Sequence, residues 1–367
     1  MGGGCHESRP RAEFPELLLR AALTRFTGDL QCDPPMVNIP ELLQKQSSGI
    51  EAFLRSQLPP GQNPYLSDGV WYQMSSGGKR LRPALCLITC EALRGDPSRA
   101  LPFAVATEIL HNYLLIHDDI EDGDTVRRDM PTLWVKEGIP NAINIADFMI
   151  AKAYRLILGA PLSPETNARL ADLFSLAFER TVEGQALDIN LRGSREVTLE
   201  TYYRIVQLKT AYYLALTWVG GAVVAGVGDA AVESLWELGR CLGPAFQIRD
   251  DIIDLTQGKG RGGEIGCDLK EGKPSIFMAY VVDRRRGTEA DRARFLEILA
   301  KPRDSTTAED VAWAIQFYRD TGALEFAQAE AAKLIAKAEN VISTLPLDES
   351  GREVFRAISR FMIDRVT

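Results

Sequence analysis

The sequence is poor in the residues that build several common kinds of functional site. Its 367 residues include only 3 histidines, and none of its 6 cysteines belongs to a C-x-x-C pair. A zinc site held by imidazole and thiolate ligands is therefore not expected. Cys86 and Cys90 lie one helical turn apart in an apolar pattern, which favours ordinary packing in the core.

Long hydrophobic runs and an excess of basic residues are missing as well. The apolar stretch 218–228 is about half as long as the ~20 residues of a membrane span. Arg20 and Arg25 interrupt the apolar residues near the N-terminus, which argues against a signal peptide. The net charge of −8, from 42 basic and 50 acidic residues, argues against a nucleic acid or an anionic membrane as partner. We expect no membrane span, no nucleic-acid partner and a cytoplasmic location.

Sustained alternation of polar and apolar residues, which marks half-buried strands, is also absent. Helical periodicity runs instead from Ile39 onward, and the pair Gly220-Gly221 predicts a kink or a close helix contact. Residues 1–38 form an N-terminal extension that we expect to be partly disordered, because 1–11 is rich in glycine and charge. We predict one all-α domain over 39–367, with helices at 40–58, 84–93, 100–119, 141–158, 163–191, 198–227, 229–255, 275–285, 289–299, 308–321, 323–345 and 349–365.

Two aspartate-rich segments are present, each at the end of an apolar helical stretch. The first reads H-N-Y-L-L-I-H-D-D-I-E-D over 111–122, and the second reads F-Q-I-R-D-D-I-I-D over 246–254. The spacing of Asp118 and Asp122 places both on one helical face. Like charges at this spacing destabilise a helix by a few tenths of a kcal/mol, so we expect a cation there. Facing carboxylates suit Mg²⁺, which prefers oxygen ligands and substrate phosphates.

Basic residues accompany these acids. Arg127 and Arg128 follow the first segment directly, and other motifs contain Lys79, Arg82, Lys209 and Lys273. In a chain of negative net charge, bases near acid clusters suggest clamps for an anion. Surface ion pairing is the alternative interpretation for any one of them. The predicted substrate is therefore a phosphorylated anion.

Together these motifs resemble those of the trans-isoprenyl diphosphate synthases, the polyprenyl synthetase family. The resemblance covers about Gly77 to Lys273 and, more loosely, the rest of the helical domain. It implies an all-α fold of the isoprenoid synthase type, a single large helical bundle with a central substrate cavity. Its markers are G-G-K-R-L-R-P at 77–83, the two aspartate segments, R-R-D-M-P-T-L-W at 127–134, G-Q-A-L-D at 184–188, K-T at 209–210 and G-C-D-L-K-E-G-K at 266–273.

The resemblance also implies the reaction, a Mg²⁺-dependent head-to-tail (1′-4) condensation of isopentenyl diphosphate with an allylic diphosphate (dimethylallyl, geranyl or farnesyl). Metal ions make the allylic diphosphate a better leaving group, and the double bond of isopentenyl diphosphate attacks the resulting cation. The released diphosphate can remove the last proton, so no protein base is required. Apolar walls would protect the cation from water. A homodimer is expected from the same resemblance.

Individual residues take roles from the family motifs. The implied metal ligands are Asp118, Asp119 and Asp122 on one wall and Asp250, Asp251 and Asp254 on the other. The allylic diphosphate would be bound by Arg127, Lys209, Thr210, Gln247 and Lys273. Isopentenyl diphosphate would occupy a pocket made by Gly78, Lys79, Arg82, His111 and Arg128. Gln185 and Asp188 would line the same groove, and the implied catalytic set is Asp118, Asp119, Asp122, Lys209, Asp250 and Asp251.

One position departs from the family pattern. Many members have a lysine shortly before the segment at 266–273, and Glu264 stands there in this chain. Lys259 or Arg261 of the same loop could take over its contact. The departure affects one diphosphate contact and not the class of reaction.

Product length is predicted from Tyr113, five residues before Asp118 and about 7.5 Å back along the helix axis. An aromatic ring at that depth would form a floor for the growing chain, while the next residue, Leu114, is not aromatic. This combination resembles geranylgeranyl diphosphate synthases, with farnesyl diphosphate as the alternative product. Ordinary core packing is the alternative role for Tyr113.

Two other functions compete with this prediction. A terpene cyclase shares the fold but carries a second metal motif of N/S/E type, whereas D-D-I-I-D stands at 250–254 here. A non-catalytic partner subunit would be expected to lose one aspartate segment or the bases of the isopentenyl pocket. This sequence keeps all of them.

Overall fold

The computed structural model describes residues 37–77, 80–256 and 264–363. The chain divides after Val37, and the larger unit runs from Asn38 to Thr367. The predicted disorder of the N-terminal extension falls almost entirely outside the described residues, as do the predictions for Gly78, Lys79, Lys259 and Arg261. The description below concerns the larger unit.

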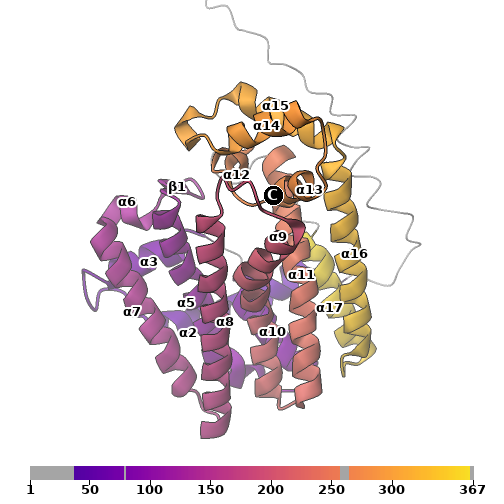
Figure 1. Cartoon of the computed structure of the whole chain (residues 1–367). Helices are drawn as coiled ribbons and strands as arrows, with labels where there is room; N and C mark the ends of the chain where they lie inside the picture. The colour runs from indigo at the N-terminus through magenta and orange to yellow at the C-terminus, as the bar shows by residue number, and fades with distance from the viewer. Residues whose placement is uncertain (1–36, 78–79, 257–263, 364–367) are drawn as a thin grey trace, which may run out of the picture. The chain divides into compact units, whose positions relative to one another are not determined.

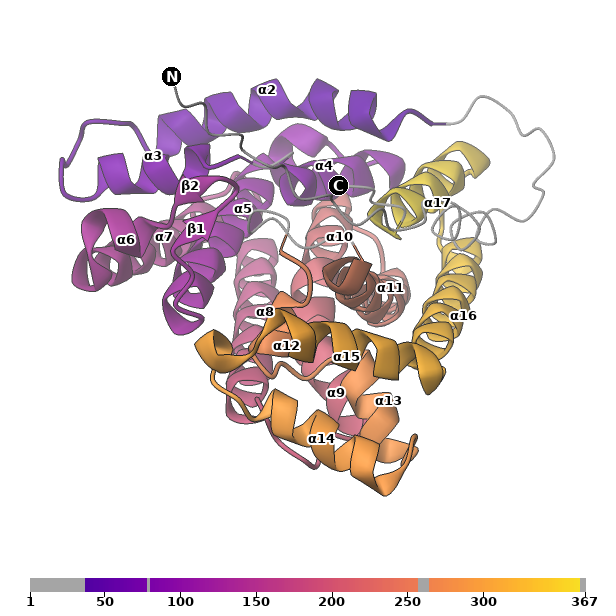
Figure 2. The ribbon, with the colours of Figure 1, turned by 90° about the horizontal axis from the view of Figure 1, so that it is seen from above.

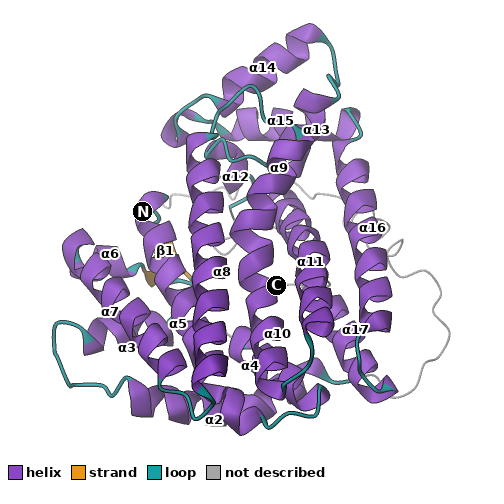
Figure 3. Ribbon diagram, turned by 60° about the horizontal axis from the view of Figure 1, so that its bottom comes forward, coloured by secondary structure: helices purple, strands orange, loops and turns teal. Residues whose placement is uncertain are grey.

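The larger unit is built from helices (Figures 1 and 3), which confirms the predicted all-α class. The only strands among the described residues are the two-residue β1 (Val126–Arg127) and β2 (Met130–Pro131), which pair antiparallel. The helices are α2 (Ile39–Gln57), α3 (Ser67–Ser75), α4 (Leu81–Ala92), α5 (Pro97–Glu121), α6 (Leu133–Glu137), α7 (Ile139–Leu158), α8 (Pro164–Asn190), α9 (Leu199–Val206), α10 (Tyr212–Ala225), α11 (Asp229–Thr256), α12 (Cys267–Lys270), α13 (Ile276–Asp283), α14 (Glu289–Leu299), α15 (Ala308–Asp320), α16 (Ala323–Thr344) and α17 (Glu349–Ile363).

Several helices begin at residues whose side chains cap the free backbone N–H groups. Asp96 accepts a hydrogen bond from the backbone N–H of Ser98 at the start of α5, where proline occupies the first helical position. Ser163 caps α8 in the same way. Capping boxes formed by Thr288 with Asp291 and by Thr307 with Asp310 begin α14 and α15. These local signals explain why most helix starts agree with the predicted ranges to within a few residues.

The structure differs from the predicted helices in two ways. The short helices α3, α6 and α12 were not predicted, because each contains nine or fewer residues and shows too little periodicity. The helix predicted over 198–227 is not regular. A π-helical turn, η1 (Gln207–Ala211), separates α9 from α10.

Helix α10 is the core of the bundle and packs against α4, α5, α8 and α11. The stretch Leu199–Ala225 is long and apolar enough to cross a membrane, but its most apolar 18-residue window, with a mean hydropathy of 1.2, is 67% buried inside the protein. It is therefore a buried core helix. A Cβ atom on Gly221 would lie 2.3 Å from the carbonyl oxygen of Cys86 on α4, which confirms the predicted close helix contact. Cys86 and Cys90 are buried and unpaired, as predicted.

The two helices that carry the aspartates, α5 and α11, lie on either side of α10 in both views (Figures 1 and 2). Hydrogen bonds and ion pairs join the C-terminal ends of both helices to the segment around α12. The backbone N–H of Gly266 donates to the carbonyl oxygen of Asp254 on α11, and Lys273 pairs with Asp122 after α5. The two aspartate segments, which are more than a hundred residues apart in the sequence, therefore meet at one end of the bundle.

Candidate active site

Two adjoining cavities lie between α5, α8, α11 and the π turn. The larger has a volume of about 380 Å³ and the smaller about 150 Å³, and both are lined by Asp118, Lys209, Thr210 and Gln247. The larger cavity is mostly apolar, and its other lining residues include Leu81, Tyr113, Leu114, Leu115, Thr181, Val182, Tyr213, Leu214, Phe246 and Met362. The smaller cavity is polar, with Asp188, Asp251, Asp268 and Lys273 in its walls.

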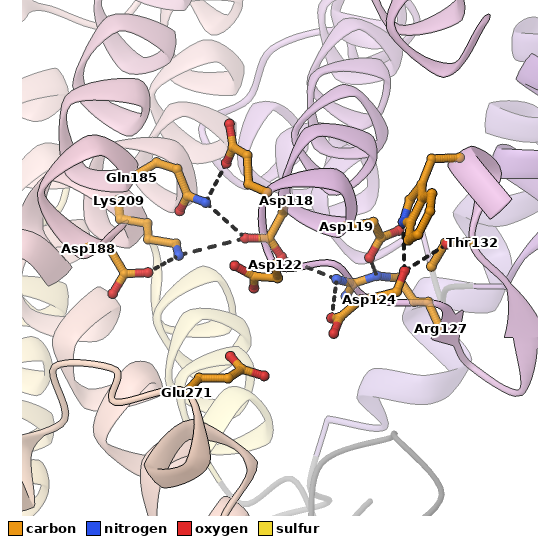
Figure 4. A network of polar contacts seen from close by, with 12 residues as sticks. Asp118, Asp119, Asp122, Asp124, Arg127, Thr132, Gln185, Asp188, Lys209 and Glu271 are labelled. Atoms are coloured by element: carbon orange, nitrogen blue, oxygen red, sulfur yellow. Dashed lines mark hydrogen bonds and ion pairs between the residues drawn. The ribbon is translucent and has the colours of Figure 1, made fainter. Parts of the chain in front are cut away.

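Asp118 stands where the two cavities join. Its Oδ2 atom lies 3.2 Å from the guanidinium of Arg127. Its Oδ1 atom accepts a hydrogen bond from Gln185 at 3.3 Å and lies 3.7 Å from the ammonium of Lys209. Figure 4 shows Gln185 and Lys209 approaching from one side and Arg127 from the other. The carboxylate is thus surrounded by donors and half-exposed to the cavities.

Asp119 faces away from the cavities and lines neither of them. It is buried, and its Oδ1 atom accepts a hydrogen bond from Nε of Arg127 at 2.5 Å. Burial raises the pKa of Asp119 to about 6, although Arg127 acts in the opposite direction. Arg127 also lies 3.8 Å from Asp124. Asp119 therefore fixes the position of Arg127 beside Asp118.

Asp122, the residue after α5, has a fully buried side chain held by two cations. Arg192 lies 2.6 Å from its Oδ1 atom, and Lys273 lies 2.8 Å from its Oδ2 atom. Burial alone would raise the pKa of Asp122, but Lys273 and Arg192 outweigh burial and hold this pKa well below its usual range. Lys273 has a second acidic partner, Glu271, at 2.8 Å. These pairs connect the end of α5 to the segments after α8 and α12.

Lys209 projects from the π turn into the junction of the cavities. Its ammonium donates to Asp188 on α8 at 2.8 Å, and Asp188 is also 3.6 Å from Arg192. The hydroxyl of the next residue, Thr210, donates to the amide oxygen of Gln247 on α11 at 3.5 Å. The structure therefore brings together the predicted residues Gln185, Asp188, Lys209, Thr210 and Gln247.

The second aspartate segment contributes one acid to the smaller cavity. Asp251 accepts hydrogen bonds from the hydroxyl of Tyr202 and the amide of Gln247, both at 3.0 Å, and from the backbone N–H of Ile276 at 3.2 Å. Asp254 is buried and accepts from the backbone N–H of Asp268 at 3.2 Å. Asp250 is half-buried, and neither Asp250 nor Asp254 is among the described residues that line these two cavities.

Part of the predicted isopentenyl pocket lies in the wall of the larger cavity, where Arg82 and His111 are found. The guanidinium of Arg82 stands 4.5 Å from the ring centroid of Tyr213, and the ring of His111 lies 5.8 Å from the same ring. Arg128 reaches back and donates to the carbonyl oxygen of Gly77. Gly77 begins the G-G-K-R-L-R-P motif, whose next two residues lie outside the described part of the chain.

The surroundings of His111 predict a pH dependence of stability. Burial, together with Arg82, Arg128, Arg127 and Arg80, holds the pKa of His111 well below its ordinary value, so the native protein keeps this imidazole neutral. The unfolded chain binds a proton there near pH 6.5. As the pH falls below about 6.5, the unfolded state gains a proton that the native state does not bind. The free energy of unfolding should then fall by at most about 1.4 kcal/mol per pH unit.

Urea unfolding of the protein and of His111→Gln between pH 7.5 and 5.5, run at ~0.5-unit steps, measures this effect. Other groups, such as Asp119 with its raised pKa, contribute to both proteins and cancel in the comparison. The stability difference between the two proteins should change as the pH falls. Parallel curves would show that His111 is not held neutral.

Tyr113 borders the larger cavity, as does Leu114. The ring of Tyr113 meets Phe178 on α8 edge to face at 5.2 Å and lies 4.5 Å from the ring of His117. Leu110, Thr107 and Ala106, which precede Tyr113 on α5, are buried and do not line this cavity. The ring of Tyr113 is therefore a braced part of the cavity wall.

Some residues of the site were not predicted from the sequence. Arg192 and Tyr202 hold Asp122 and Asp251 respectively, and Tyr213 borders the larger cavity. The i,i+4 spacing of Asp188 and Arg192 was a signal for one of them. At the position that departs from the family pattern, Glu264 pairs with Lys270 at 2.5 Å.

The candidate metal ligands are aspartate carboxylates with no thiolate beside them, and such oxygen ligands suit a hard divalent cation. Among the described residues, however, no three acidic, imidazole or thiolate groups converge closely enough to hold an ion by themselves. The acids are instead paired with Arg127, Arg192, Lys209 and Lys273. A Mg²⁺ ion, which usually completes its shell with waters and substrate phosphates, is compatible with such a partial set of ligands.

The chain is similar to known proteins over most of its length. The polyprenyl synthetase family model matches residues 63–318. A short chain isoprenyl diphosphate synthase of Methanothermobacter thermautotrophicus is 31% identical over 331 residues, covering 90% of this chain and 99% of the relative. A geranylgeranyl diphosphate synthase of Methanosarcina mazei is 30% identical with the same coverage.

Solved structures give the same result. The geranylgeranyl pyrophosphate synthetase of Pyrococcus horikoshii superposes with a TM-score of 0.81 at 31% identity, covering 89% of this chain and 98% of that one. A polyprenyl synthase of Caulobacter crescentus, complexed with calcium and isoprenyl diphosphate, superposes with a TM-score of 0.78 at 25% identity, covering 91% and 100%.

Proposed function

Because the chain belongs to the polyprenyl synthetase family, we propose that it condenses isopentenyl diphosphate head to tail (1′-4) with an allylic diphosphate. The observation that carries this proposal is the pair of adjoining cavities, one polar and one apolar, joined at Asp118 and Lys209. An allylic diphosphate is likewise polar at one end and apolar at the other. Its diphosphate matches the polar cavity, and its prenyl chain matches the apolar one.

Asp118 and Asp122 from α5 and Asp250 from α11 would hold Mg²⁺, with Asp119, Asp251 and Asp254 as the supporting acids. Bound Mg²⁺ neutralises the charge that develops on a leaving diphosphate. Arg127, Lys209 and Lys273, which pair with carboxylates, would bind diphosphate oxygens at the same place. Thr210 and Gln247 would add neutral hydrogen bonds. Preorganised donors of this kind stabilise the transition state for C–O ionisation.

The second substrate would use a site without metal. Arg82, His111 and Arg128, with Gly78 and Lys79, would hold the isopentenyl diphosphate so that its double bond faces the allylic carbon. The neutral imidazole of His111 can donate one hydrogen bond without adding charge. The apolar wall of the larger cavity would exclude water from the allylic cation. The released diphosphate would take the final proton, which leaves no step that needs a protein base.

We propose geranylgeranyl diphosphate as the main product, with Tyr113 as the floor of the cavity. The test is product analysis with purified protein, Mg²⁺, radiolabelled isopentenyl diphosphate and dimethylallyl, geranyl or farnesyl diphosphate in turn. Label should accumulate in geranylgeranyl diphosphate. Label that stops at farnesyl diphosphate would support the alternative product. No consumption of isopentenyl diphosphate with any starter would refute the enzyme and favour the non-catalytic subunit.

Replacing Tyr113 by alanine should lengthen the product by at least one isoprene unit, because it would remove the ring proposed as the floor of the larger cavity. The measurement is the chain-length distribution of products from radiolabelled isopentenyl diphosphate. Tyr154→Ala is a matched control, since Tyr154 packs edge to face on Phe174 in the bundle but lines neither cavity. The control should keep the wild-type products. An active Tyr113→Ala enzyme with the same products would place the floor elsewhere.

A homodimer remains the proposed assembly. Ile139 and Ile143, one turn apart on α7, are 46% and 38% exposed. A second copy of the chain could cover these apolar side chains. The cytoplasmic location also stays a prediction.

A further inference from the structure

The π turn Gln207–Ala211 carries Lys209 and Thr210, the two residues of the K-T motif. Its signature is the hydrogen bond from the backbone N–H of Tyr212 to the carbonyl oxygen of Gln207, five residues earlier. Such turns are rare, occur mostly as single bulges within α-helices and often mark functional sites. Neither proline nor glycine occurs within this one. The cause of the π turn must therefore lie in what packs around it.

The wider turn has a geometric consequence for the site. The pairs Ile205/Val206, Lys209/Thr210 and Tyr213/Leu214, spaced four residues apart, all line the two cavities. In a regular α-helix of 3.6 residues per turn, positions four apart drift around the axis by about 40° at each step. Because a π turn holds more residues than an α turn, each of its residues rotates less around the axis, and residues four apart stay closer to one side of the helix. Both Lys209 and Thr210 can then face the cavities.

Two glycines on neighbouring helices allow the π turn to approach closely. A Cβ atom on Gly184 of α8 would lie 2.3 Å from the backbone nitrogen of Lys209 and 2.7 Å from its Cα atom. A Cβ atom on Gly243 of α11 would lie 2.6 Å from the Cα atom of Ala211. Both contacts are with backbone atoms, which cannot move aside as a flexible side chain can. Only glycine leaves room for the turn in its present place.

We infer that Gly184 and Gly243 are positioning residues for the diphosphate site. The backbone of the π turn packs directly against both glycines, and this packing, which we call the glycine seat, orients Lys209 and Thr210. The two glycines lie one on each side of the turn. A methyl group on either one would push the turn away from α8 or α11. The ammonium of Lys209, now 2.8 Å from Asp188 and 3.7 Å from Asp118, would move with it. This inference rests on the proposed function for its kinetic test.

Gly184→Ala and Gly243→Ala should each lower kcat/KM for the allylic diphosphate by roughly 10- to 100-fold, because a displacement of about 1 Å at a reacting site can cost that much. Gly221→Ala is the matched control. Its Cβ atom would also overlap a backbone atom, the carbonyl oxygen of Cys86 at 2.3 Å, but Gly221 faces α4 and not the cavities. The control should lose stability and keep its kcat/KM, measured per folded molecule below its melting temperature.

A double-mutant cycle separates a positioning role from a general structural role. If Gly184 acts through Lys209, Gly184→Ala should cause much less further loss in a Lys209→Met background than in the wild type. Fully additive losses would overturn the inference, as would equal kcat/KM values for Gly184→Ala and Gly221→Ala. An inactive wild type would instead refute the proposed function.

Hydrogen exchange provides a test that does not require the alanine variants to fold. If the glycine seat holds the π turn, the amide of Tyr212 in the free wild-type protein should exchange as slowly as the buried amides of α10. Fast exchange that slows only when Mg²⁺ and inorganic diphosphate are added would show that the ligand, and not the seat, forms the turn.

Discussion

Asp118→Ala should lower kcat by about two to three orders of magnitude, with the protein still folded. Asp118 stands at the junction of the polar and apolar cavities, with Arg127 at 3.2 Å and Lys209 at 3.7 Å. Its removal takes away a carboxylate aimed at the charge that grows as the C–O bond breaks. Loss of one such stabilising group typically costs ~3–4 kcal/mol in the transition state. The measurement is steady-state turnover at saturating Mg²⁺ and both substrates.

The matched control for this variant is Asp147→Ala. Asp147 lies on α7, is exposed to solvent and lines neither cavity. The control removes one negative charge from the chain and should leave kcat unchanged. Turnover of Asp118→Ala that equals turnover of the control would remove Asp118 from the metal site.

Arg80→Met should destabilise the protein by about 3–5 kcal/mol, because it leaves a buried carboxylate without its cation. Arg80 lies 2.9 Å from Glu108, and the two side chains are only 12% and 5% exposed. Arg80 also donates to the carbonyl oxygen of Met74 at 2.8 Å. The expected loss is a large share of the 5–15 kcal/mol that stabilises a typical protein. Urea unfolding with linear extrapolation measures it.

Two further variants distinguish a buried pair from an exposed one. Arg180→Met makes the same change in an exposed pair, in which Arg180 lies 2.7 Å from Glu183, and should cost far less stability, because solvent screens exposed ion pairs. Adding Glu108→Met to Arg80→Met removes the buried carboxylate that would otherwise lack a cation, and should restore much of the lost stability. If Arg80→Met cost no more than Arg180→Met, the buried pair would not be an important part of the core.

The position of the acids shows how far the sequence could predict the site. The i, i+1, i+4 spacing places Asp118 and Asp122 on one face, and the structure finds both among cationic side chains at the same end of the bundle. The spacing does not show which carboxylates border a cavity. Asp119 turns to Arg127, and Asp251 is held by Tyr202 and Gln247. Their orientations depend on partners from other elements.

The aromatic wall illustrates the same limit. The family resemblance implied that Tyr113 borders the substrate cavity, and Tyr113 does line the larger cavity. That Phe178 braces it edge to face depends on how α8 packs against α5. No local pattern in the sequence encodes that contact.

The sequence by itself determined the helical class, most helix starts and the presence of two aspartate segments, each at the end of an apolar helix. Periodicity and capping act over a few residues, so the local sequence carries them. Tertiary structure alone decided the π turn, which local propensity does not favour. Gly184 and Gly243 come from two other helices, and only their packing against the turn leaves room for the backbone that presents Lys209 and Thr210.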